Sequence, residues 1–61
     1  MSSNINRLLD ARVDFLLFQI DARKSQIEHE HSIETINELN AEIKVMLNEL
    51  EFLESIILCT Q

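Results

Sequence analysis

The second half of the chain carries a regular heptad pattern of large apolar residues. Apolar residues at alternating spacings of three and four form one stripe along a helix, and such a stripe is the contact seam of a coiled coil. The stripe consists of Ile36, Leu39, Ile43, Met46, Leu50, Leu53 and Ile57. Just before it, Thr35 to Glu38 fits a capping box, and Ser32 is a competing cap one turn earlier. We therefore predict a helix over about residues 33–59.

The first half of the chain carries two apolar stripes on one predicted helix, over about residues 4–28. One stripe continues the heptad frame backwards and consists of Leu8, Ala11, Phe15, Phe18 and Ala22. The other consists of Leu9, Val13, Leu16, Ile20 and Ile27. We assign the in-frame stripe, through Leu8, Phe15 and Phe18, to the seam with the second helix. The other stripe is then a dimer or partner face, because a helix that is apolar on two sides belongs inside an assembly.

The heptad frame fails only in the middle of the chain, where Ser25, His29 and Ser32 are polar. Two architectures fit this pattern: a two-helix antiparallel hairpin that bends at about residues 28–32, and a single long coiled-coil helix. The hairpin matches small residues with large ones and gathers the polar residues at its bend, whereas the long helix buries them in succession. We therefore predict an all-α, single-domain hairpin that dimerises into a four-helix bundle.

The charges beside the predicted seam count against the hairpin in this register. They bring Asp14 near Glu49 and Asp21 near Glu42, which are pairs of like charges. The cost at an exposed surface is small, and the long parallel helix also opposes like charges. Charge therefore does not choose between the two architectures.

The composition supports a helical fold and points to association. The 61 residues include no Gly and no Pro, which are the usual residues of tight β-turns. A chain of this length buries only about 60% of the surface that its unfolded form exposes. Hydrophobic residues make up 46% of the chain, which is more apolar surface than a single pair of helices can bury. This excess favours self-association or a partner.

The net charge and the single cysteine limit the setting in which the chain works. A net charge of −6 disfavours binding to phosphate backbones and anionic membranes. The apolar run over residues 13–20 is interrupted by Asp14 and Gln19, so we expect neither a signal peptide nor a membrane span. Cys59 has no partner for an intramolecular disulfide, and we expect a cytoplasmic protein.

The residue types that carry chemistry are not arranged for it. His29 and His31 point about 200° apart on a helix, so we interpret them as part of a polar hinge rather than as metal ligands. Glu38 and Glu42 lie near no predicted cleft that would separate their pKa values. Cys59 has no nearby His in the sequence to activate it. We expect no enzymatic activity, no cofactor and no metal site.

Helix pairing is the function that these features favour. We expect a small interaction module of the chaperone, adaptor or inhibitor type, which pairs with itself or with an amphipathic helix of another protein. A dimer of acidic hairpins also resembles, in architecture only, the Rop-type RNA-binding bundles, and this resemblance implies a nucleic-acid-binding dimer. Its phosphate contacts would be Arg7, Arg12, Arg23 and Lys24. A third alternative is an acidic inhibitor that mimics DNA through its Glu-rich second half.

Overall fold

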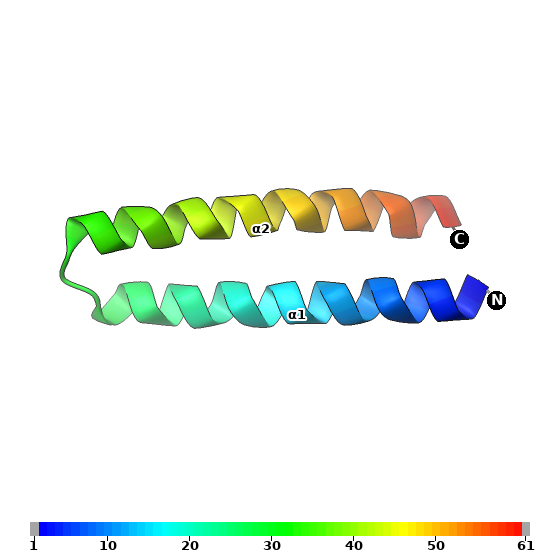
Figure 1. Ribbon diagram of the computed structural model, residues 1–61, viewed down its shortest axis with the longest axis horizontal. Coiled ribbons are helices and arrows are strands. Elements are labelled where there is room, and N and C mark those ends of the chain that lie inside the picture. The colour runs from blue at the N-terminus through cyan, green and yellow to red at the C-terminus, as the bar shows by residue number, and fades with distance from the viewer. Residues whose placement is uncertain (1, 61) are drawn as a thin grey trace.

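The chain folds into two antiparallel helices joined by a short bend (Figure 1). The computed structural model describes residues 2–60, and the side chains of residues 5–59. Helix α1 spans Ser2–His29 and helix α2 spans Ile33–Thr60, and the free ends of both helices lie at the same end of the molecule. The predicted all-α hairpin is therefore confirmed, and the alternative of one continuous helix is wrong. Within the described part of the chain, neither helix is long and apolar enough to cross a membrane.

The bend between the helices is stabilised by the side chain of Glu30. Its Oε1 accepts hydrogen bonds from the backbone N–H groups of His31, at 3.0 Å, and Ser32, at 3.1 Å. The N–H of Glu30 itself donates to the carbonyl oxygen of Ile27 at 3.2 Å. No residue among those described has a positive φ. The chain thus reverses without the left-handed conformation for which Gly is normally used, because a carboxylate satisfies the exposed backbone donors.

Ser32 is the N-cap of α2. Its Oγ accepts a hydrogen bond from the N–H of Thr35 at 3.4 Å, and its carbonyl oxygen accepts one from the N–H of Ile36 at 3.0 Å. Glu34 places a carboxylate in the first turn, where it interacts favourably with the positive end of the helix dipole. Of the two caps that the sequence offers, Ser32 is the one used, and Thr35 lies inside the first turn.

The core lies between the two helices and is made of aliphatic side chains. The buried residues are Leu16, Ile20, Leu39, Ile43, Leu50 and Leu53. The residues Leu9, Val13, Ile27 and Met46 pack against this core, and Ile36 is half-buried. From α2 the core takes the heptad stripe. From α1 it takes Leu9, Val13, Leu16, Ile20 and Ile27, which together are called the inner face below.

The side of α1 that meets α2 is not the predicted one. Leu8, Phe15 and Phe18 were assigned to the seam, and they are 73%, 50% and 68% exposed. The stripe assigned to a dimer or partner packs against α2 instead, and Leu16 at its centre is only 1% exposed. The assignment of the two stripes of α1 was therefore wrong. At 3.6 residues per turn, α1 is rotated by about 150° from the predicted orientation.

The charges that border each stripe favour the observed orientation. With the inner face against α2, Arg12 lies opposite Glu49 and Arg23 lies opposite Glu42. In the predicted orientation, acidic residues of α1 faced the same two glutamates. Either apolar stripe of α1 has the spacing needed to pack against α2. Only packing through the inner face places basic rather than acidic residues of α1 opposite the two glutamates of α2.

Candidate interaction surface

Most of the apolar residues of α1 that α2 does not cover form one stripe, and exposed Ile5 and Leu17 lie outside it. Its members are all exposed: Leu8, Ala11, Phe15, Phe18 and Ala22, called the outer stripe below. Their alternating spacings of three and four are those of a coiled-coil seam. The centre of the outer stripe lies about 150° around α1 from the centre of the inner face. The hairpin therefore exposes an apolar stripe with coiled-coil spacing on the side of α1 away from α2.

Arg12 connects the outer stripe to α2. Its Nε donates a hydrogen bond to Oε2 of Glu49 at 2.8 Å, and its Nη2 donates one to Oε1 at 3.2 Å. The same guanidinium carbon lies 5.2 Å from the centroid of the Phe15 ring, within the range of a cation–π interaction. The paired guanidinium thus covers part of the ring, which remains half-exposed on the stripe.

The Arg12–Glu49 contact shifts the pKa of both groups. The hydrogen bond to Glu49 raises the pKa of the Arg12 guanidinium, against the effect of desolvation and with the help of charge attraction. The same hydrogen bond lowers the pKa of the Glu49 carboxyl, again against desolvation and with charge attraction. Both side chains are substantially exposed, so the pair contributes little to the stability of the fold.

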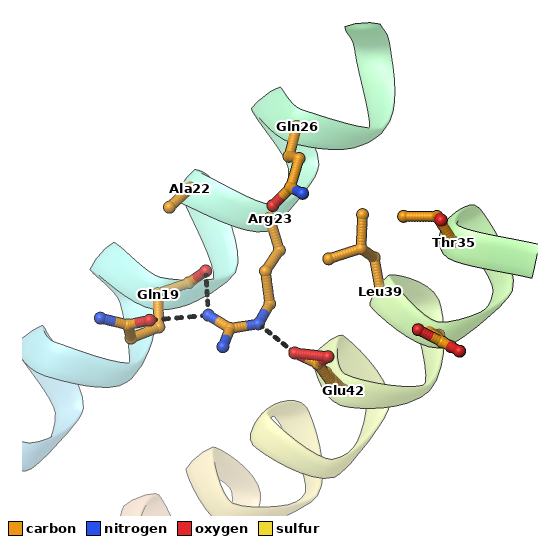
Figure 2. Close-up of a pocket in the computed structure, with 8 residues that line it drawn as sticks. Gln19, Ala22, Arg23, Gln26, Thr35, Leu39 and Glu42 are labelled. Atoms are coloured by element: carbon orange, nitrogen blue, oxygen red, sulfur yellow. Dashed lines mark hydrogen bonds and ion pairs between the residues drawn. The ribbon is translucent and has the colours of Figure 1, made fainter. Parts of the chain in front are cut away.

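A second ion pair spans the helices nearer the bend, in a polar pocket (Figure 2). The pocket is lined by Gln19, Ala22, Arg23, Gln26, Thr35, Glu38, Leu39 and Glu42. Nε of Arg23 donates to Oε1 of Glu42 at 2.8 Å. Its Nη1 donates to both the side-chain and the backbone oxygen of Gln19, at 2.7 Å and 3.1 Å. Figure 2 shows Arg23 reaching from α1 toward α2 between these partners, so the guanidinium in this pocket is already engaged.

The two ion pairs lie on one side of the hairpin, called the ion-pair flank. On α1 this flank is bordered by the outer stripe. On α2 it is bordered by Val45 and Phe52, which are 66% and 65% exposed. Sequence reasoning missed these two residues. Their spacing of seven, on the side of α2 where Glu42 and Glu49 lie, is the signal that identifies them.

The opposite side of the hairpin is predominantly acidic. This acidic flank carries the exposed residues Asp10, Asp14, Asp21, Glu28, Glu51 and Glu54, together with Lys24 and Lys44. The two ion pairs contain two basic and two acidic residues, so they contribute nothing to the net charge of −6. Each ion pair is thus locally neutral, and the excess negative charge comes from other carboxylates, including that of Glu38 in the pocket.

The remaining candidate residues from the sequence lie apart from one another. His29 ends α1, and His31 lies in the bend, where it is exposed. Among residues 2–60, no three His, Cys, Asp or Glu side chains are grouped so that they would hold a metal ion. Cys59 is a free, exposed thiol near the end of α2.

The four basic residues of the first half do not gather on one surface. Arg12 and Arg23 are paired with glutamates of α2. Arg7 and Lys24 are exposed on other sides of α1. These four residues therefore do not form the extended basic surface by which proteins bind a phosphate backbone.

Comparison of the chain with protein-family models, curated proteins and solved structures gives no match. The structure itself shows a short antiparallel helical hairpin that exposes an apolar stripe along α1. The function is accordingly inferred from the outer stripe and its surroundings.

Proposed function

We propose that this chain is a protein–protein interaction module that acts by helix–helix pairing and associates with a second copy of itself through the outer stripe of α1. The observation that carries the proposal is the exposure of Leu8, Phe15 and Phe18 at seam spacing. Contiguous exposed apolar surface on a small protein marks an interaction site. The spacing indicates that the surface complementary to it is another helix.

The energetics of the outer stripe favour association. Removing a Phe or Leu side chain fully from water is worth roughly 1.5–3 kcal/mol. Three such residues, each at least half exposed, leave a large part of this free energy unused in the isolated hairpin. A 61-residue chain has a thin core, so a dimer that buries this stripe also stabilises the fold.

The placement of charge supports a second copy as the occupant. The outer stripe contains no charged residue, and Arg12 at its edge is neutralised by Glu49. Two acidic chains therefore approach along this surface with little mutual repulsion. An amphipathic helix of another protein would compete for the same stripe. This competition is the mechanism by which an adaptor, chaperone or inhibitor of this size would work.

Sedimentation equilibrium of the purified chain tests the proposal. At high micromolar concentration we expect a mass of twice 7.1 kDa. Phe18→Asp places a charge in the stripe and is expected to give a monomer that keeps its helical circular dichroism. Phe52→Asp is the matched control, because Phe52 is an equally exposed Phe on α2, and this variant is expected to remain dimeric. A wild-type monomer, or equal dissociation by both variants, would contradict the proposal.

A further inference from the structure

The sizes of the residues along the outer stripe fit a second copy of the same stripe running in the opposite direction. From the N-terminal end, the stripe reads large at Leu8, small at Ala11, large at Phe15 and Phe18, and small at Ala22. We infer that the α1 helices of two copies pack antiparallel along their outer stripes, with the two-fold axis at the level of Val13. This inference rests on the self-association proposed above, and adds its direction, register and arrangement of helices.

The register follows from the geometry of antiparallel helix pairs. Along a seam, the step from one seam residue to the next is alternately three and four residues. In an antiparallel pair, a residue that precedes a step of three lies opposite a residue that precedes a step of four. With the axis at Val13, Ala11 opposes Phe15 of the second copy, and Leu8 opposes Phe18 of the second copy. Every bulky ring then meets a smaller side chain, which is the condition for a well-filled seam.

The other arrangements of two α1 helices pack less well. A parallel pair would place each residue opposite its own copy, giving two Phe–Phe layers and two Ala–Ala layers. An antiparallel pair shifted by one heptad would set Phe15 against Phe18 and Ala11 against Ala22. Both alternatives crowd the large residues together and leave cavities at the small ones. Size complementarity thus selects the register centred on Val13.

The charges that flank the stripe favour the same direction. In the antiparallel pair, Arg7 of each copy lies beside Asp21 of the other, which gives two attractive contacts related by the two-fold axis. Asp14 faces Asp14 of the other copy near the axis, which is one repulsive contact against the two attractive ones. Arg12 also faces its own copy, on the opposite edge, where Glu49 already neutralises it. The parallel pair instead sets Arg7 beside Arg12 of the other copy and gives no attractive contact.

The position of the outer stripe also determines where α2 lies in the dimer. Because the stripe is about 150° around α1 from the inner face, the four helices form a bent row, with the two α1 helices inside and the two α2 helices outside. A closed four-helix bundle would instead turn the ion-pair flank toward its centre. That arrangement would bury Arg12–Glu49 and Arg23–Glu42 away from water, at a large cost in desolvation.

Distances between spin labels on the two copies test the direction and the register. In a Cys59→Ser background, single labels are introduced by Asp14→Cys and by Ser25→Cys, two exposed positions on the same edge of the outer stripe. The antiparallel register predicts a distance below about 20 Å between the labels at position 14, because that position lies beside the axis. The two labels at position 25 lie on opposite sides of the axis, each 12 residues away from it. At a rise of about 1.5 Å per residue, the predicted distance between them is about 35–40 Å.

The alternatives give different distances. Short distances at both positions would overturn the antiparallel inference and leave the proposed self-association intact, since a parallel pair keeps equal residues side by side. Long distances at both positions, in a sample with dimer mass, would show that a surface other than the outer stripe is used. A monomer mass with no coupling between labels would overturn both the inference and the proposed function. Helical circular dichroism of each labelled variant establishes that it is folded.

Discussion

The two apolar stripes of α1 are alike in length and periodicity, yet α2 covers only one of them. The inner face is aliphatic throughout, and Leu16 at its centre is almost completely buried. The outer stripe carries Phe15 and Phe18 between two alanines, and it is exposed along its whole length. The two stripes differ in composition and also in their neighbours, because Arg12 and Arg23 lie beside the inner face and pair with glutamates of α2. Hydrophobic pattern makes a helix face able to pack, and the flanking charges choose which face packs against a given partner.

A charge placed on the inner face, and then on a neighbouring position outside both stripes, tests whether one face of α1 is needed for folding. Leu16→Asp puts a carboxylate at a fully buried position and is expected to lower the free energy of unfolding by at least about 3 kcal/mol. Leu17→Asp makes the same change at the adjacent, half-exposed residue and is expected to cost no more than about 0.5 kcal/mol. Urea denaturation followed by far-ultraviolet circular dichroism measures both. Similar losses from the two substitutions would show that α1 has no preferred face.

A smaller effect sharpens the role of charge. Arg23→Glu turns an ion pair into a repulsive contact with Glu42 and is expected to cost roughly 0.5–1 kcal/mol of stability. Adding Glu42→Arg to the same chain is expected to restore most of that loss, because the reversed pair re-forms across the helices. Lys24→Glu is the matched control, since it changes the net charge equally but lies on the acidic flank. Denaturant midpoints of the three variants and the wild type give the comparison, and an equal loss from Lys24→Glu would assign the effect to net charge alone.

Much of the hairpin could be predicted from the sequence. The heptad stripe through Leu39, Ile43 and Leu50 identifies the face of α2 that packs, and the polar residues near the middle of the chain mark where it reverses. The bend itself was harder to derive, because it uses neither Gly nor Pro. It depends on the carboxylate of Glu30 and the hydroxyl of Ser32, and hydrogen bonds of this kind have no periodic signal.

The orientation of α1 could not be obtained from hydrophobic periodicity alone. Leu8, Phe15 and Phe18 continue the heptad frame of α2, and this continuity made them the apparent seam. The frame of one helix does not carry over to the next when a bend intervenes, because the bend sets a new rotation about the axis. The like charges that the predicted orientation placed together, Asp14 with Glu49, were the signal in the sequence that this orientation of α1 was wrong.

The inner face of α1 packs against α2, and we propose that the outer stripe mediates association. Isotope-filtered nuclear Overhauser spectra of a dimer made from one labelled and one unlabelled chain distinguish these two roles. We predict that the Leu16 methyl groups contact Ile43 and Leu50 within their own chain. We also predict that the Phe18 ring contacts Leu8 of the other chain and not Leu8 of its own chain. Contacts from Phe18 to Ile43 or Leu50 of its own chain, with Leu16 contacting the other chain, would contradict this assignment of roles and reverse the two faces.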